Sequence, residues 1–480
     1  MDADRYQLLC DFYELTMGNG YLASGMQGRI TYFDVFFRRV PDGGGYAIAA
    51  GLQQVIDYIR TLRFTDEDIA FLRGKGIFSA EFLAYLRSFC FSGDVWAVPE
   101  GTPVFPNEPI LIVRGPAIQA QLIETYVLLA INHQSLIATK AARIVRAAQG
   151  RPVTEFGSRR AQGADAAVLG ARAAYIAGVA GTACVLADQA FGVPSGGTMA
   201  HSWVQMFDSE YEAFRTYCQL YPKATTLLVD TYNVLKSGVP NAIRAFREVL
   251  LPQGITQCAI RLDSGDLTYL SQRARRMLDE AGLPGCKIVA SNALDEHIIV
   301  DLIAQGARID AFGVGERLIT SKSEPVFGCV YKLSAIEDAS GVIHPRIKIS
   351  ENEAKVTNPH FKKVYRLYDR ATGHALADQL CVHDETIDEG QPLELFDPQF
   401  TWKRKTIEHF TARSLLQIIF RGGQLVYQPP TLQQIRAYCA QELSHIWEEV
   451  QRLENPHRYY VDLSEKLWGI KKELLERVGG

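Results

Sequence analysis

Arg261, Asp263 and Asp266 stand close together at the end of an apolar, strand-like run. A guanidinium binds anionic oxygens as a fork, and carboxylates accept hydrogen bonds from sugar hydroxyls or hold Mg²⁺. The three side chains could therefore orient a hydroxylated, phosphorylated substrate. The alternative is an ordinary helix start, with Asp263 or Ser264 as the cap and Asp266 favouring the helix dipole. Both interpretations are open at this point.

Two further groups of chemically capable residues follow predicted strands. His201 lies beside Gly196 and Gly197, and an imidazole at a strand end can act as a base, an acid or a nucleophile. Phe156 and Arg159 follow another strand, where the ring could stack on a flat heterocycle and the cation could bind a carboxylate or a phosphate. The alternatives are a surface or core histidine, a core phenylalanine and a solvated arginine.

Gly313 and Gly315 follow a late strand, and Thr320 and Ser321 come soon after. Glycines at such a position let backbone N–H groups approach a phosphate, which is the usual phosphate site of a βα barrel. A tight turn is the alternative, because two glycines with one residue between them form only a weak motif.

These polar groups all come at the ends of apolar runs, which is how a βα barrel builds its active site. The predicted strands lie at 153–156, 178–181, 197–201, 226–230, 258–263, 288–291 and 309–313. Their spacing suits one strand and one helix per repeat, so we expect an irregular α/β barrel of about seven units. The fold class is α/β, and the protein is expected to be an enzyme.

The regions on either side of the barrel have mixed patterns. We predict an N-terminal α+β domain over 1–118, the catalytic barrel over 119–326, a segment that completes the α+β domain over 327–430, and a helical tail over 431–480. The barrel region opens with one long helix at 119–149, and strands are expected at 329–333, 346–349 and 363–367. Charged residues of the tail, Glu442 among them, are expected to form a solvated helical face.

Composition excludes several classes of protein. The formal net charge of −4 gives no basic surplus for a nucleic-acid backbone or an anionic membrane. The start of the chain, 1–5, is acidic and is not expected to be a secretory signal, and the weakly polar stretch 166–187 is expected to be barrel core. The nine cysteines include no CxxC pair, which favours a reducing, cytoplasmic location without a structural zinc site.

Taken together, six blocks resemble those of nicotinate phosphoribosyltransferases. They are DFYELTM at 11–17, EFGSRR at 155–160, GTMAHS at 197–202, VDTYN at 229–233, RLDSGD at 261–266 and FGVGE at 312–316. The resemblance implies a type II phosphoribosyltransferase fold, in which an irregular α/β barrel is joined by a second α+β domain assembled from both ends of the chain.

The resemblance also implies an activity and its co-substrates. Members of the family join nicotinate to phosphoribosyl pyrophosphate, with coupled ATP hydrolysis and a requirement for Mg²⁺, as ATP-dependent ligases of NAD biosynthesis. By matching position, ATP would phosphorylate His201, with Asp230 positioning His201 or the ring. Arg261 and Asp263 would lie near the ribose. The metal ligands are not assigned, because substrate phosphates would hold most of the Mg²⁺.

The remaining roles that the resemblance implies concern the pyridine ring and the 5′-phosphate. Phe156 would stack on one face of the ring and Tyr13 of a neighbouring subunit on the other, so the protein would be a homodimer with a shared site. Arg159 would bind the carboxylate. The other substrate-binding residues would be Ser291 and, around the 5′-phosphate, Gly313, Gly315 and Thr320.

Substrate choice depends on one position in this comparison. Nicotinamide-specific relatives carry an aspartate shortly after the second barrel strand, and here Ala183 stands at that place. A carboxylate there would repel nicotinate, so alanine favours the acid. The alternatives are a nicotinamide or quinolinate phosphoribosyltransferase and, from another class, a catalytically silent scaffold, which would have been free to lose His201, Asp263 or the glycines.

Overall fold

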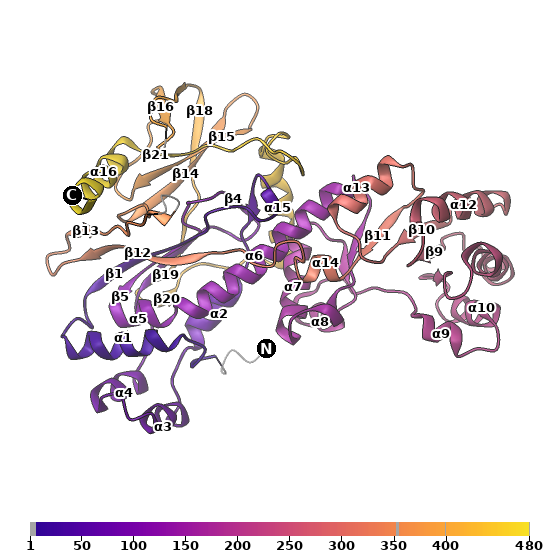
Figure 1. Ribbon diagram of the computed structural model, residues 1–480, viewed down its shortest axis with the longest axis horizontal. Helices are drawn as coiled ribbons and strands as arrows, with labels where there is room; N and C mark the ends of the chain where they lie inside the picture. The colour runs from indigo at the N-terminus through magenta and orange to yellow at the C-terminus, as the bar shows by residue number, and fades with distance from the viewer. Residues whose placement is uncertain (1–5, 352–354, 399, 480) are drawn as a thin grey trace. The chain divides into compact units, whose positions relative to one another are not determined.

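The computed structural model describes residues 6–351, 355–398 and 400–479, which form two compact units (Figure 1). Unit 1 comprises Met1–Leu136 and Val326–Gly480, and unit 2 comprises Ile137–Pro325. The expectation about a secretory signal concerns 1–5, which lie outside the described residues. Among the described residues, no helix combines the length and the apolar content needed to cross a membrane.

Unit 2 is built on a six-stranded parallel sheet. In spatial order its strands are β7 (Gly181–Thr182), β6 (Val153–Glu155), β11 (Ala311–Val314), β10 (Lys287–Ala290), β9 (Ala259–Leu262) and β8 (Thr226–Leu228). Their central residues are apolar and fully buried, Leu227, Ile260 and Ile288 among them, as expected for parallel strands covered on both faces. The predicted α/β architecture is confirmed. The sheet is a six-stranded half-barrel, whereas the sequence predicted a barrel of about seven units.

Helices follow the strands of unit 2 along the chain. They include α7 (Ala164–Ile176), α8 (Val185–Phe191), α10 (Glu210–Leu220), α11 (Val239–Ala245), α12 (Leu267–Glu280), α13 (Glu296–Ala304) and α14 (Glu316–Ile319). In α12 the buried residues are Ser271, Ala274 and Leu278, spaced as one helical stripe requires. Because this face packs on the core, it fixes the orientation of α12 and thereby the path of the loop between β9 and α12.

The predicted strand at 197–201 is wrong. The segment is a loop that ends where helix α9 (His201–Gln205) begins, and an isolated parallel bridge between Thr182 and Ser195 is its nearest strand-like pairing. Gly196 and Gly197 have no side chains to pack on either face of a sheet, so the backbone gains little from strand pairing. The loss of this strand accounts for the difference between six strands and seven.

The long helix predicted at 119–149 is two helices, α5 (Ala117–Leu122) and α6 (Glu124–Ala147), separated at Ile123. Good helix formers stand on both sides of Ile123, so composition does not reveal the break. The boundary between the compact units falls inside α6, after Leu136, whereas the sequence division was placed at 118.

Unit 1 contains two larger antiparallel sheets that draw on both ends of the chain. The seven-stranded sheet has the order β13 (Ile343–Pro345), β12 (Val330–Glu337), β1 (Ile30–Phe36), β5 (Leu111–Pro116), β3 (Asp94–Ala97), β19 (Gln417–Arg421) and β20 (Gln424–Leu425). The four-stranded sheet has the order β18 (Phe410–Ser414), β14 (Lys362–Asp369), β15 (Ala375–Val382) and β21 (Val461–Leu463). All pairings are antiparallel except β15 with β21.

Smaller elements complete unit 1. They are the two-stranded antiparallel pairs β2 (Ala47–Ile48) with β4 (Pro103–Val104) and β16 (Leu393–Phe396) with β17 (Arg404–Ile407), and the helices α1 (Phe12–Ala23), α2 (Leu52–Thr61), α3 (Asp66–Gly74), α4 (Ala80–Arg87), α15 (Leu432–His445) and α16 (Glu465–Gly479). The strand predicted at 346–349 is wrong, because β13 ends at Pro345. Within the tail, Glu442 is buried against Arg413, so it is not part of a solvated face.

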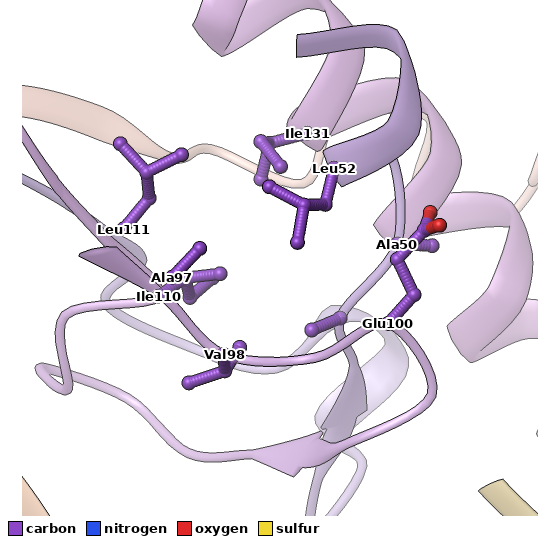
Figure 2. A pocket seen from close by; sticks show the side chains of 9 residues that line it. Ala50, Leu52, Ala97, Val98, Glu100, Ile110, Leu111 and Ile131 are labelled. Atoms are coloured by element: carbon purple, nitrogen blue, oxygen red, sulfur yellow. The ribbon is translucent and has the colours of Figure 1, made fainter. Parts of the chain in front are cut away.

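The core of unit 1 closes around a hollow near the start of α2 (Figure 2). Apolar side chains line it, and they leave no room for a water molecule; they include Leu52, Val98, Ile110, Leu111 and Ile131. Glu100 lies at its edge and accepts a hydrogen bond from the N–H of Gly51 at 2.7 Å. Gly51 has φ of +102°, which favours glycine, so the buried carboxylate fixes the turn that starts α2.

Arg366 and Asp378 form a fully buried ion pair on β14 and β15. Two hydrogen bonds of 2.8 and 2.6 Å join the guanidinium to the carboxylate, and the hydroxyl of Tyr459 donates to the same carboxylate at 2.9 Å. A further N–H of Arg366 donates to the carbonyl of Pro103 at 2.9 Å. This network connects the β14–β15 pair with two segments of unit 1 that are distant in sequence, at Pro103 and Tyr459.

Asp462, on β21, makes stability depend on pH. Burial and then the carboxylate of Asp397 raise the pKa of Asp462 to about 7. Between about pH 4 and pH 7 the folded chain therefore keeps a proton that the unfolded chain has lost, so the free energy of unfolding falls as pH rises. Relative to the wild type, D462N is expected to gain about 1 kcal/mol between pH 5 and pH 8, after a reduction for solvent screening. Urea denaturation at both pH values measures this gain, and identical pH dependence in the two proteins would contradict it.

Candidate active site

The carboxyl ends of β9 and β10 hold Arg261 in a fixed position. Its Nε donates to Ser291 Oγ at 2.8 Å, its Nη1 to Thr198 Oγ1 at 2.8 Å and its Nη2 to Asp263 Oδ1 at 3.0 Å. The Ser291 hydroxyl also donates to Asp263 Oδ1. Four side chains from three segments thus form one hydrogen-bonded cluster, in which the cation and the carboxylate are oriented by neutral hydroxyls.

Asp263 and Asp266, which both follow β9, have different hydrogen-bond partners. Asp266 is the cap of α12, since its Oδ1 accepts from the N–H of Tyr269 at 2.9 Å. Asp263 does not cap the helix but turns toward Arg261 and Ser291. The helix-start interpretation is therefore confirmed for Asp266 and not for Asp263, and a role for Arg261 and Asp263 in a site stays a prediction.

Asp230, at the end of β8, joins the same cluster. Its Oδ2 accepts from the N–H of Asp263 at 3.0 Å and from Ser264 Oγ at 2.6 Å. Its Oδ1 is buried and has no hydrogen-bond partner among the described residues. A carboxylate oxygen in this state has capacity left for a ligand hydroxyl or a cation.

His201 stands at the first position of α9 beside these carboxylates. Its Nδ1 lies 3.1 Å from Thr231 Oγ1, and its Nε2 lies 3.9 Å from Asp263 Oδ2, too far for a hydrogen bond but close enough for electrostatic attraction once the ring is protonated. The side chain is 42% exposed, so Nε2 is accessible to an incoming group. Thr231, which orients the ring, received no role from the sequence although it directly follows Asp230.

Phe156 lies against Gly313, which explains one of the two late glycines. A Cβ at Gly313 would lie 2.5 Å from two ring carbons of Phe156, so only glycine leaves room for the ring. The guanidinium carbon of Arg261 is 5.6 Å from the ring centroid. At Gly315 a Cβ would lie 3.1 Å from the carbonyl oxygen of Phe156. Gly313 therefore makes room for the Phe156 ring, and Gly315 allows two backbone segments to approach closely. Phosphate binding by these glycines stays a prediction.

Three other sequence-predicted residues are not members of the hydrogen-bonded cluster. Arg159 is exposed on the 3₁₀ turn Ser158–Arg160, and Thr320 Oγ1 donates to the carbonyl of Glu316 at 2.7 Å. Tyr13 belongs to unit 1, on α1, and is 42% exposed. Burial, followed by the nearby Glu124 carboxylate, raises the pKa of Tyr13, so the phenol keeps its proton at neutral pH.

The donor set suits a partly protein-bound Mg²⁺ ion. The described residues contain no group of three or more His, Cys, Asp or Glu side chains that could hold a metal ion. Asp230 and Asp263 are nevertheless adjacent, and Asp230 has one uncommitted oxygen. One or two carboxylates combined with substrate phosphates are the usual ligands of Mg²⁺, so these two residues fit that arrangement.

Three family models match the chain and together span most of it. They are the nicotinate phosphoribosyltransferase N-terminal domain over residues 8–132, the nicotinate phosphoribosyltransferase family over 152–381 and the nicotinate phosphoribosyltransferase C-terminal domain over 361–471. The matched segments contain all the cluster residues described above.

Comparison with individual proteins gives the same family. Nicotinate phosphoribosyltransferase of Bacillus subtilis (strain 168) is 44% identical over 475 residues, 99% of this chain and 96% of that protein. The crystal structure of human nicotinic acid phosphoribosyltransferase superimposes with a TM-score of 0.83 at 30% identity, over 98% of this chain and 100% of that chain. The nicotinate-nucleotide pyrophosphorylase of Pyrococcus furiosus shares the fold, with a TM-score of 0.70 at 23% identity over 93% and 97% of the two chains.

Proposed function

Since this chain belongs to the nicotinate phosphoribosyltransferase family, we propose that the cluster at the carboxyl ends of its parallel strands carries out the family's reaction. The protein is an enzyme of NAD salvage that forms nicotinate mononucleotide and pyrophosphate from nicotinate and phosphoribosyl pyrophosphate. The observation that best supports the site is the hydrogen-bonded arrangement of Arg261, Asp263 and Ser291 beside the Phe156 ring.

Asp230 and Asp263 stabilise the sugar during transfer. Positive charge develops on the ribose as pyrophosphate leaves, and fixed carboxylates at that position lower the energy of the transition state. Both are already oriented by protein hydrogen bonds, so little reorganisation is needed. Asp230 or Asp263, together with substrate phosphates, would hold Mg²⁺, which would supply positive charge to offset the negative charge on the departing pyrophosphate.

His201 accepts a phosphoryl group from ATP and so couples ATP hydrolysis to transfer. Thr231 contacts Nδ1, which leaves the exposed Nε2 as the atom available for phosphorylation. Asp263 lies 3.9 Å from Nε2, and Asp230 acts through its hydrogen bonds to Asp263 and Ser264. The coupling is the means by which the enzyme favours the nucleotide product.

The ring of nicotinate stacks on Phe156, and Arg159 binds its carboxylate. Tyr13 of a second copy of the chain covers the other ring face, which makes the enzyme a homodimer with shared sites. The exposure of Tyr13 supports this role, because a ring that must reach a neighbouring subunit has to lie at the surface. Ala183 leaves the pocket without a negative charge and so favours nicotinate over nicotinamide.

The 5′-phosphate lies near Gly313, Gly315 and Thr320, where small residues keep the backbone accessible. Of the three, Gly315 is the best supported, because the Phe156 ring already lies against Gly313 and the Thr320 hydroxyl is bonded to a carbonyl. The nine cysteines are all free thiols, which is consistent with work in the reducing cytoplasm.

Pyrophosphate release from phosphoribosyl pyrophosphate tests this function, with nicotinate, nicotinamide or quinolinate offered separately, with and without Mg-ATP. Release with nicotinate alone, stimulated by ATP, is the expected result. Release only with nicotinamide would overturn the role of Ala183, and silence with all three substrates would favour the catalytically silent scaffold.

A further inference from the structure

Glu155, the last residue of β6, is a fully buried carboxylate that none of the roles above employs. It is 0% exposed, and burial raises its pKa while hydrogen bonds from Thr182 and Gly157 oppose the rise. Burying a carboxylate is unfavourable unless its oxygens are well paired. A carboxyl group at this depth, at the carboxyl end of a central strand, therefore needs hydrogen-bond partners that compensate its burial.

The two oxygens of Glu155 hold two different loops. Oε1 accepts from the N–H of Gly157, in the loop that carries Phe156 and Arg159. Oε2 accepts from the hydroxyl of Thr182 at 2.6 Å, at the end of the neighbouring strand β7. Both donors point at the carboxylate, so each oxygen acts as an acceptor and the ionised form satisfies both at once.

Thr182 extends the connection to the loop that follows β7. Its Oγ1 accepts from the N–H of Cys184 at 2.9 Å, and the N–H of Ala183 donates to the backbone carbonyl of Glu155 at 2.8 Å. The backbone of Thr182 also bonds to Pro194 at 3.0 Å and Gly196 at 2.9 Å, in the segment that leads to His201. Thr182 is itself 0% exposed, so water cannot replace these bonds.

Gly157 shows how closely the loops are fitted around this carboxylate. A Cβ at that position would lie 2.7 Å from Glu155 Oε1, 2.6 Å from Ile319 Cγ2 and 2.7 Å from the carbonyl oxygen of Gly315. The N–H of Gly157 can reach Glu155 only because no side chain intervenes. The approach of the Phe156 loop to β11 and α14 is therefore set by the same contact.

We propose that Glu155 and Thr182 are positioning residues that set the distance between the Phe156 loop and the Ala183 loop, and so define the slot for the pyridine ring. The inference rests on the function proposed above, because that function places the ring between these loops. Neither residue touches the substrate. The bridge formed by their hydrogen bonds holds Phe156, which stacks on the pyridine ring, at a fixed distance from Ala183, which favours the acid over the amide. Productive binding requires this fixed geometry.

Thr182→Val tests the bridge, because valine keeps the volume and removes the hydroxyl. It leaves Glu155 Oε2 and the N–H of Cys184 without their partner, so the KM for nicotinate is expected to rise about tenfold. The KM for phosphoribosyl pyrophosphate should change less than about twofold, since the ribose cluster around Arg261 does not involve Thr182. The kcat/KM preference for nicotinate over nicotinamide should fall as well.

Thr182→Ser is the matched control and should behave as wild type, because serine restores the hydroxyl. Glu155→Gln is the second variant and should raise the KM for nicotinate selectively, since its amide offers an acceptor to only one of the two donors. Equal kinetics for the valine and serine variants would overturn the proposal, as would parallel increases in both KM values with a lowered Tm. Wild-type pyrophosphate release with nicotinate tests the proposed function separately, so failure of either idea can be recognised.

Discussion

Replacing His201 with alanine is expected to abolish the stimulation of nicotinate turnover by Mg-ATP while the fold remains intact. The side chain is 42% exposed, and its polar contacts among the described residues are with Thr231 and the Asp263 carboxylate, so its removal is not expected to open a cavity in the core. If His201 is the phosphoryl acceptor, the variant lacks the nucleophile, and the ratio of rates with and without ATP should fall to about 1. Pyrophosphate release measures the ratio, and transfer of a γ-phosphate label to the protein should be lost completely.

His344 provides the control for this substitution. It is similarly exposed, at 46%, and pairs with Asp338 on the surface of unit 1. His344→Ala should keep both ATP stimulation and label transfer. If His201→Ala retains wild-type stimulation, the phosphoryl acceptor is another group and the assignment of His201 is wrong.

Among the substitutions considered, replacing Asp378 with alanine is expected to lower the free energy of unfolding most, by about 3–5 kcal/mol. The substitution leaves the guanidinium of Arg366 fully buried without its carboxylate and removes the acceptor of the Tyr459 hydroxyl. A buried guanidinium that loses its carboxylate is costly because water cannot reach it, although the buried carboxyl of Glu108 still interacts with Arg366 electrostatically. Urea denaturation should show the midpoint falling sharply.

Two further variants separate the charge effect from general damage. Lys466→Ala breaks an exposed pair with Asp384, whose side chains are 48% and 55% exposed, and should cost less than about 1 kcal/mol. The double variant Arg366→Met with Asp378→Leu removes both charges and should be more stable than Asp378→Ala alone. A double variant that is as unstable as the single one would show that packing, not charge, dominates at this position.

The strand ends of unit 2 were predictable because they are marked by composition. Apolar runs that are buried on both faces stop abruptly at polar residues, as at Asp230, Asp263 and Ser291, so β6, β8, β9, β10 and β11 could be located from the sequence. The functional roles of the polar residues at their ends stay predictions. The same reasoning wrongly placed a strand at 197–201. The spacing suggested one more repeat of strand and helix, but the glycines in this segment do not favour strand pairing.

What could not be predicted depends on contacts between distant segments. Glu155 stood in a recognised block, yet only its burial and its bond to Thr182 reveal a use for it. Gly313 was assigned to phosphate binding, and nothing local indicates that the Phe156 ring fills the space beside it. Thr231 and Thr198 are short polar side chains whose importance follows from their partners, His201 and Arg261, and not from their own positions.

The pairing of β1 has a consequence for the order in which the protein can fold. β1 lies between β5 and β12, and Ile30 pairs with Glu337, so the strand is synthesised long before one of its two neighbours. The whole of 137–325 leaves the ribosome first and can complete its parallel sheet while one edge of β1 is still open. Open strand edges recruit other chains, and late, long-range pairing prolongs that exposure. Nascent chains and fragments that stop before β12 are therefore the forms of this protein most prone to aggregate.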